Sequence, residues 1–259
     1  MQLQGKVAIV TGGGKGIGRA IALAFAREGA KLVLAARDAE ALARVAEEVA
    51  RAQAEVLTVA ADVADEGQVA AMVAQAVERF GRVDILVNNS GVPGPTKPLW
   101  EMEPAEWDEV MNVNLRGSYL CARTVMPAML KQGAGRIINI SSILGRQPLA
   151  GRSPYVSSKA GLVGLTQTLA HEAGPHGITV NLISPGATAG DRLDLVLTRL
   201  GAAQGMNLEQ TKAAVLRDTP LRRFVEADDV ARAAVFLASD AAANITGEDL
   251  NVTAGRGMW

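Results

Sequence analysis

The chain has 259 residues, of which 26 are basic, 27 are acidic and 49% are apolar. This charge balance argues against a nucleic-acid partner and a polybasic membrane patch, and the apolar fraction excludes a disordered chain. With one cysteine, Cys121, and two histidines, we expect neither an internal disulfide nor a metal site. We find no signal peptide and no apolar run of about 18 residues, which predicts a cytoplasmic protein without a membrane span.

In chain order, short apolar segments alternate with segments whose apolar residues recur at helical spacing. We predict strands at residues 6–11, 31–35, 55–60, 84–88, 136–141, 178–183 and 249–252. We predict helices at residues 17–25, 38–52, 65–80, 105–131, 154–173 and 227–238, and a less regular stretch at 186–220.

Strands that are apolar throughout are typical of parallel sheets buried on both faces. Because crossovers between such strands are right-handed, we predict an α/β fold of the Rossmann type. It is a doubly wound parallel sheet of about seven strands with helices on both faces. No linker or charge block divides the chain, so we expect a single domain, 1–259.

The first predicted strand leads into a glycine-rich turn, residues 11–18 (TGGGKGIG), and then into a helix. Glycines allow a sharp turn and close approach of a pyrophosphate, and the free N–H groups of a helix N-terminus favour anions. A plain strand-to-helix turn is the alternative, but the place at the start of an α/β pattern favours dinucleotide binding. The candidate cofactor ligands here are Gly12, Lys15, Gly16, Ile17 and Gly18.

The end of the second strand distinguishes NAD from NADP. NAD-binding proteins usually have an acid there for the ribose hydroxyls, whereas this chain has Ala36 followed by Arg37. Arg37 and Lys15 suit a 2′-phosphate, so we favour NADP(H), with NAD(H) as the alternative. Two other interpretations stay open: both cations are solvated surface charges, or Asp38 reaches the ribose in a shifted alignment.

Tyr155 and Lys159 lie four residues apart in a predicted helix whose first turn holds Pro154, so they share one face. A phenol, with a reference pKa of about 10, is a poor base at neutral pH, but a nearby ammonium stabilises the phenolate. The pair can therefore act as a general acid/base. A chance pairing of a packed tyrosine with a surface lysine is the alternative.

Ser142 and Asn114 are two further candidates. Ser142 ends a strand, at the edge where doubly wound sheets bind ligands, so it could hydrogen-bond a substrate oxygen; capping of the turn is the alternative. Asn114 lies in the middle of a predicted helix, where asparagine is unfavourable. It could open the backbone or hold a water near Lys159.

Together these residues resemble the short-chain dehydrogenase/reductase family in its classical form, over essentially the whole chain. The motifs that carry the resemblance are the glycine turn at 11–18, Asn88-Asn89-Ser90-Gly91, Asn114, Ser142, Tyr155 to Lys159 (YVSSK) and Pro185-Gly186. The resemblance implies an NAD(P)-dependent oxidoreductase that transfers hydride between the nicotinamide and a carbonyl or secondary alcohol.

The resemblance also implies the role of each residue. Tyr155 is the acid/base, and Ser142 orients and polarises the substrate carbonyl. Lys159 stabilises the phenolate and binds the nicotinamide ribose, and Asn114 positions a water of a proton relay. The implied cofactor contacts are Asp62 and Val63 at the adenine, Asn88 to Gly91 along the cofactor, and Pro185 and Gly186 beside the nicotinamide.

The chain departs from the family pattern at three places. Ser90 replaces the alanine of the Asn-Asn-Ala-Gly motif, which is a small change. Gly190 stands where many members have a threonine that contacts the carboxamide, and Thr188 is the candidate replacement. The last strand is followed by 253–255 (TAG) in place of Asp-Gly-Gly.

We expect residues 187–220 to form a lid over the substrate, with an amphipathic helix at 191–200. Arg146, Gln147 and Arg152 could bind a polar or anionic substrate, unless they are solvated. The family resemblance implies a homotetramer, and the C-terminal residues 257–259 could insert into a neighbouring subunit.

Three functions remain open. The first is a reductase of small ketones or aldehydes, or of a 3-oxoacyl thioester, with NADPH. The second is an alcohol or polyol dehydrogenase that works oxidatively with NAD. The third is a nonenzymatic dinucleotide sensor, which the intact group of Asn114, Ser142, Tyr155 and Lys159 disfavours.

Overall fold

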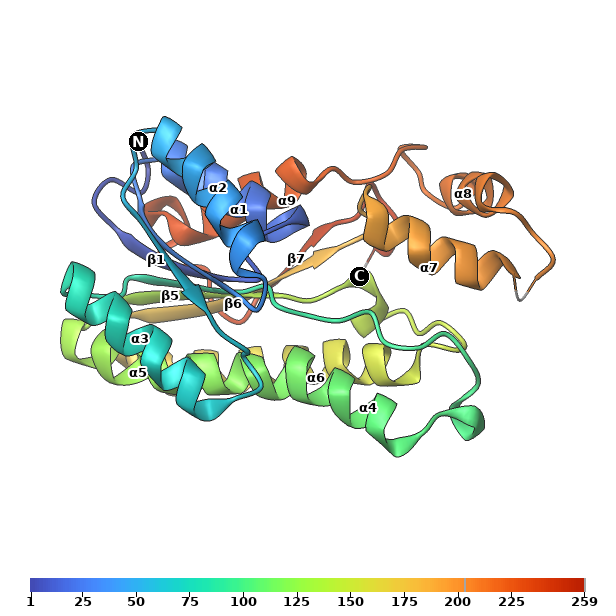
Figure 1. Cartoon of the computed structure of the whole chain (residues 1–259), viewed down its shortest axis with the longest axis horizontal. Coiled ribbons are helices and arrows are strands. Elements are labelled where there is room, and N and C mark those ends of the chain that lie inside the picture. Colours follow the sequence, from blue (N-terminus) through green and yellow to red (C-terminus); the bar gives the residue numbers. More distant parts are fainter. Residues whose placement is uncertain (203, 259) are drawn as a thin grey trace.

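The computed structural model describes residues 1–202 and 204–258. Within them, seven strands form one fully parallel sheet in the order β3-β2-β1-β4-β5-β6-β7 (Figure 1). The strands are β1 Val7–Thr11, β2 Lys31–Ala36, β3 Val56–Ala60, β4 Ile85–Asn88, β5 Gly135–Ile140, β6 Ile178–Pro185 and β7 Asp249–Val252. The predicted doubly wound fold is confirmed, and each predicted strand is present with its ends shifted by at most two residues.

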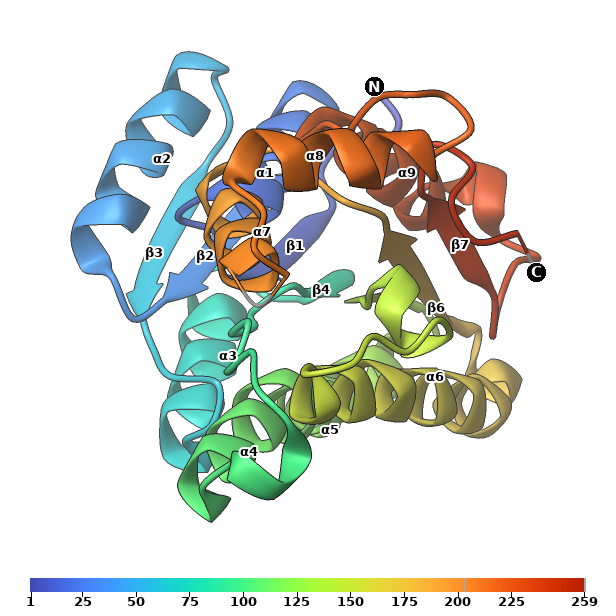
Figure 2. The same cartoon turned by 90° about the vertical axis from the view of Figure 1, so that its right-hand side faces the viewer.

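Helices cover both faces of the sheet (Figure 1). One face carries α1 Gly16–Arg27, α2 Ala39–Arg51 and α9 Ala227–Ala238, and the other α3 Glu66–Phe80, α4 Pro104–Met111, α5 Gly117–Gln132 and α6 Ser153–Ala173. Two more helices, α7 Asp191–Ala202 and α8 Leu208–Arg217, extend beyond the sheet on the right of Figure 1, and Figure 2 views them from that side. The short elements are η1 Leu99–Glu101, the π-helical turn η2 Asn112–Arg116, η3 Ile143–Gly145, η4 Gly174–His176 and η5 Asp240–Ala242.

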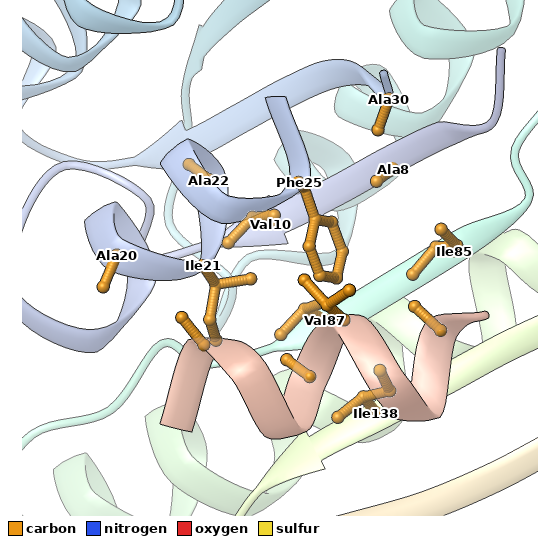
Figure 3. Close-up of a cluster of buried hydrophobic side chains, with 14 of the residues drawn as sticks. Ala8, Val10, Ala20, Ile21, Ala22, Phe25, Ala30, Ile85, Val87 and Ile138 are labelled. Atoms are coloured by element: carbon orange, nitrogen blue, oxygen red, sulfur yellow. The ribbon is translucent and has the colours of Figure 1, made fainter. Parts of the chain in front are cut away.

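An apolar core lies on each side of the sheet, because strands buried on both faces present side chains to both helix layers. On the α1 side, Phe25 and Ile21 reach towards Val87 of β4 and Ile138 of β5 (Figure 3). Full burial of a side chain such as Phe25 contributes roughly 1.5–3 kcal/mol. These contacts hold α1 against the sheet directly behind the glycine turn.

Two parts of the chain differ from the prediction. The helix predicted at 105–131 is divided into α4, the π turn η2 and α5, with Asn114 inside the π turn. The stretch predicted as less regular, 186–220, contains the amphipathic helix α7 but also α8, which was not predicted. Helix α8 begins with a capping box in which Asn207 and Gln210 bond each other's backbone N–H groups.

Within the described residues, no helix is both long and apolar enough to cross a membrane. The same part of the chain contains no group of three or more His, Cys, Asp or Glu side chains arranged to hold a metal ion. Trp259, for which the sequence suggested a subunit contact, lies outside the described residues.

The glycine turn requires glycine at position 18. A Cβ atom at Gly18 would lie 2.2 Å from the Gly12 carbonyl oxygen and 2.5 Å from Asn89 Nδ2. Gly18→Ala should therefore destabilise the protein by about 1–3 kcal/mol through overpacking, measured by urea unfolding. At the exposed Gly67, a Cβ would contact only Asp65 Oδ1, at 3.3 Å. Gly67→Ala is the control, with unchanged or raised stability, and equal stability of the two variants would contradict the packing argument.

Candidate active site

The strands deliver the candidate residues to one edge of the sheet. The glycine turn follows β1, Arg37 follows β2, and Asp62 and Val63 follow β3. Asn88 is the last residue of β4 and Pro185 that of β6, while Ser142 lies two residues after β5. In a parallel sheet all carboxyl ends share one edge, so residues far apart in the sequence meet there.

The N-terminus of α1 is suited to an anion. Its N-cap, Lys15, makes no side-chain capping bond, and its first turn contains no acid. By contrast, the carboxylates of Asp38 and Asp65 cap α2 and α3. The N–H groups at the start of α1 therefore keep their positive partial charge for a ligand.

A pyrophosphate also needs room for close approach. The backbone at Gly12 has φ +65°, and a Cβ there would lie 2.8 Å from Asn89 Nδ2. Gly16 also has a positive φ, +55°, with nothing within 4 Å of its would-be Cβ. These residues and the uncapped helix fit the diphosphate of a dinucleotide.

Arg37 marks the adenosine side of the site. Its side chain is 63% exposed, and Nη1 lies 3.8 Å from Asp62 Oδ2. Asp38 does not compete for this position, since its Oδ1 accepts a hydrogen bond of 2.9 Å from the Ala41 N–H. Asp62 is held in turn by the Ala64 N–H, which donates to its Oδ1. Arg37 and Asp38 are both exposed at the end of β2, and of the two only Asp38 is used to cap α2.

Partly buried polar contacts connect the strand ends. Asn89 Nδ2 donates to the carbonyl oxygens of Thr11 and Gly12, at 2.9 and 3.2 Å, and Thr11 Oγ1 accepts from the N–H groups of Asn89 and Ser90. Asn88, in contrast, points into the protein, where its Nδ2 donates to Asn139 Oδ1 at 2.8 Å. The Asn88–Gly91 motif thus fixes the glycine turn to β4.

Lys159 is buried, with 5% of its surface exposed, and its Nζ donates a 2.7 Å hydrogen bond to the Ile140 carbonyl oxygen. Desolvation, and secondly the charge of Arg192, lower the pKa of the Lys159 amine from 10.5 to about 7. The lysine is therefore poised to gain or lose a proton near neutral pH.

Tyr155 lies near this amine, and Ser142 lies two residues beyond the strand end to which the amine is bonded. Tyr155 is partly exposed, one helical turn before Lys159, and its ring centroid is 5.8 Å from Nζ. Ser142 Oγ accepts a hydrogen bond from the Leu144 N–H, as the capping interpretation predicts. That bond uses an oxygen lone pair and leaves the hydroxyl hydrogen available to a substrate. Ser141 Oγ donates to the Lys159 carbonyl oxygen and ties α6 to the end of β5.

Asn114 lies within the π turn and is fully buried. Its Oδ1 accepts from the Val92 N–H, and its Nδ2 donates to the Val92 carbonyl oxygen and to Ser158 Oγ, at 3.1 Å each. Such single π turns are frequent at functional sites. The asparagine therefore holds the loop after β4 against α6.

The segment after β6 completes the arrangement. Thr188 Oγ1 donates to the Gly186 carbonyl oxygen at 3.2 Å, and the Thr188 backbone forms a parallel bridge with Val225. A Cβ at Gly186 would lie 2.9 Å from Thr253 Cα, so glycine is required there. Gly190 precedes the lid helix α7 with φ +133°.

Several residues of this region were not singled out in the sequence. Asn89 and Ser158 stand inside recognised motifs, whereas the carbonyl of Ile140 carried no sequence signal. Arg192 was noted only as part of the lid, yet its Nη2 donates to the Gly91 carbonyl oxygen at 2.7 Å.

A separate groove of about 820 Å³ near the C-terminus, between Phe224 and Met258, contains none of the candidate catalytic residues.

Comparisons with known proteins agree with this geometry. The family model for short chain dehydrogenases matches residues 6–197. The 3-oxoacyl-[acyl-carrier-protein] reductase FabG of Staphylococcus aureus (strain Mu50 / ATCC 700699) is 39% identical over 254 residues, 98% of each chain. A crystal structure of levodione reductase superimposes with a TM-score of 0.94 at 36% identity, covering 98% of each chain. NAD⁺-bound xylitol dehydrogenase gives a TM-score of 0.96 at 28% identity, over 98% of this chain and 100% of the other.

The chain therefore belongs to the short-chain dehydrogenase/reductase family. It is an NAD(P)-dependent oxidoreductase that acts on CH–OH and C=O groups, as the sequence predicted.

The lowered pKa of Lys159 predicts how stability changes with pH. Between pH 7 and 10.5 the native amine has lost its proton while the unfolded one keeps it, so stability of the cofactor-free protein rises with pH. One proton contributes at most about 1.4 kcal/mol per pH unit. Urea unfolding at pH 7, 8 and 9 should show this slope, and Lys159→Met should flatten it. Lys131→Met, at an exposed lysine, is the control and should keep the wild-type slope. An equal slope in the wild type and in Lys159→Met would refute the assignment of the slope to the Lys159 amine.

Proposed function

We propose that the protein is an NADP(H)-dependent carbonyl reductase, with Tyr155 as the acid/base. The observation that carries the proposal is the partly exposed Tyr155 phenol beside the buried Lys159 amine, at the carboxyl end of β5. Its substrate is a small molecule with a ketone, an aldehyde or, in the reverse direction, a secondary alcohol.

When bound, the nicotinamide cofactor supplies or accepts the hydride. Tyr155 donates its hydroxyl proton to the substrate oxygen, so that hydride and proton together convert the carbonyl to an alcohol. Ser142 donates its free hydroxyl hydrogen to the same oxygen and stabilises the negative charge that develops there. Lys159 stabilises the phenolate that remains, and its amine binds the ribose hydroxyls of the cofactor.

Asn114 has a positioning role in this proposal. Its side-chain oxygen and amide are occupied by Val92 and Ser158, so it orders the loop after β4 next to Lys159. The water relay implied by the family resemblance would form at this point, between the π turn and the lysine amine.

The proposed cofactor ligands extend along the strand ends. Gly12, Gly16, Ile17 and Gly18 hold the pyrophosphate, and Lys15 and Arg37 hold the 2′-phosphate of NADP(H). The capping role of Asp38 supports this preference, because one oxygen of its carboxylate is already used by the Ala41 N–H. Asp62 and Val63 contact the adenine, and the remaining ligands along the cofactor are Gly91, Pro185, Gly186 and Thr188. Asn88, which the resemblance also implied, has its side chain turned into the protein.

A second candidate is an NAD-dependent alcohol or polyol dehydrogenase that works oxidatively. One observation in its favour is the likeness to NAD⁺-bound xylitol dehydrogenase. Another is the ion pair between Asp62 and Arg37, which partly neutralises the positive charge of Arg37. A 3-oxoacyl thioester is a candidate substrate of the reductive reaction, since FabG of Staphylococcus aureus is a 39% identical relative.

The surrounding features complete the proposal. Residues 187–220 act as a lid, formed by α7 and α8 at the edge of the sheet that binds the cofactor. We propose that the chain acts as one domain, 1–259, in a cytoplasmic homotetramer, without nucleic-acid or membrane partners.

Removing the phenol hydroxyl tests the acid/base assignment. Tyr155→Phe should lower kcat for carbonyl reduction by about 10²–10⁴-fold, because no other group replaces the proton donor. NADPH affinity, measured by fluorescence titration, should stay nearly unchanged. The other tyrosine of the chain provides the control, and Tyr119→Phe should keep full activity. Substantial turnover by Tyr155→Phe would refute the role of the phenol.

The cofactor preference depends on Arg37. Arg37→Ala should weaken NADPH binding roughly tenfold or more, since a hydrogen bond to a charged group contributes about 1.5–3 kcal/mol, and NADH binding should change little. Arg44→Ala, an exposed change on α2, is the control for general electrostatics. Equal losses of affinity for both cofactors would overturn the preference for NADP(H).

A further inference from the structure

Arg152 is buried, although it is an arginine. Only 2% of its surface is exposed, and it is the largest of the fully buried side chains. Its Nη1 donates to Thr96 Oγ1 at 3.1 Å and its Nη2 to the Pro93 carbonyl oxygen at 2.7 Å. Both acceptors are neutral and belong to the loop after β4.

No carboxylate in the described part of the chain pairs with Arg152, whose favourable electrostatic partner there is the Tyr155 side chain. None of the ion pairs among residues 1–202 and 204–258 includes Arg152, and its buried Nε has no hydrogen-bond partner. Desolvation lowers the pKa of the guanidinium, but arginine stays protonated in proteins. A buried charge without a partner is strongly destabilising, so a protein gains by supplying an anion to it.

This unpaired cation lies beside the reacting group. Arg152 is the N-cap of α6, three residues before Tyr155, and its guanidinium carbon is 5.0 Å from the Tyr155 ring centroid. Lys159 lies near the same ring, at 5.8 Å. If one substrate carries both an anionic group and a carbonyl, Arg152 could bind the anionic group while the carbonyl, a few covalent bonds away, lies at the Tyr155 hydroxyl.

The lid adds further positive charge. Arg192 and Arg199 of α7 lie close enough to Arg152 to affect its electrostatic energy, and Arg192 also acts on Lys159. The nearby acid of the same helix, Asp194, is paired with Lys212 of α8 at 2.9 Å. Three arginines, Arg152, Arg192 and Arg199, thus interact electrostatically beside Tyr155, and the first turn of α7 also carries a second acid, Asp191.

We propose that Arg152 determines substrate specificity by binding a carboxylate on the carbonyl substrate. The inference rests on the proposed carbonyl reductase function and names its substrate class, a small oxo acid. The guanidinium fork matches the two oxygens of a carboxylate, and charge-assisted bonds are about twice as strong as neutral ones. The carboxylate therefore displaces Thr96 Oγ1 or pairs with the free Nε, and the field of Arg192 and Arg199 favours its entry.

Three oxo acids and their methyl esters test this inference: 2-oxobutanoate, 3-oxobutanoate and 4-oxopentanoate. For at least one pair, the wild-type enzyme should reduce the acid with a kcat/KM at least tenfold above that of the ester. Arg152→Gln should bring this ratio to about one, mainly by raising KM for the acid. Arg152→Lys, which keeps the charge, should retain part of the preference.

A wild-type enzyme with a higher kcat/KM for the ester of every pair would overturn the inference. An Arg152→Gln variant whose kcat/KM falls by the same factor for acid and ester would also overturn it, because that pattern indicates a purely structural arginine. Arg51→Gln, an exposed change on α2, is the matched control and should keep the wild-type ratio.

A binding measurement separates this inference from the proposed function. Calorimetry of the wild-type enzyme with NADP⁺ should show binding of hexanoate at least tenfold tighter than that of hexanamide, and Arg152→Gln should lose the difference. If no carbonyl is reduced with either cofactor, the proposed reductase function fails, and hexanoate binding alone decides the role of Arg152. Equal binding of hexanoate and hexanamide by the wild type would refute it.

Discussion

The candidate site depends on one buried hydrogen bond, from the Lys159 amine to the Ile140 carbonyl oxygen at the end of β5. It places an ionisable group from α6 directly on the edge of the sheet. The second bond at this junction, from Ser141 Oγ to the Lys159 carbonyl oxygen, prevents the helix from sliding along the strand. Because Tyr155 lies one turn earlier on the same helix, the position of the phenol follows from these two bonds.

The other strand ends are held in a similar way by two asparagines, the partly buried Asn89 and the buried Asn114. Asn89 joins the glycine turn to β4, and Asn114 joins the loop after β4 to α6. An unmade hydrogen bond in the interior costs about 1–3 kcal/mol, so these side chains fix the loops strongly. The family's glycine and asparagine motifs thus build a rigid frame, on which the less regular segments around the substrate can vary.

Much of the fold could be predicted because continuous apolar strands and helical spacing report burial directly. Tyr155 and Lys159 could be paired because both lie on one helix, and Ser142 because strand ends meet at one edge. The mid-helix position of Asn114 indicated that it could open the backbone, but its bonds to Val92 and Ser158 could not be predicted, since they join segments far apart in the sequence. Burial of Arg152 was equally hidden, because the acceptors Thr96 and Pro93 come from a loop without periodicity.

The most direct test of the account is a crystal structure of the enzyme with NADP(H) and a non-reactive carbonyl analogue. We expect the Tyr155 and Ser142 hydroxyls within hydrogen-bond distance of the same analogue oxygen, about 2.5–3.0 Å, with the Lys159 amine in contact with the nicotinamide ribose. A complex in which the Tyr155 hydroxyl points away from the nicotinamide, or in which Lys159 touches only Ile140, would contradict it.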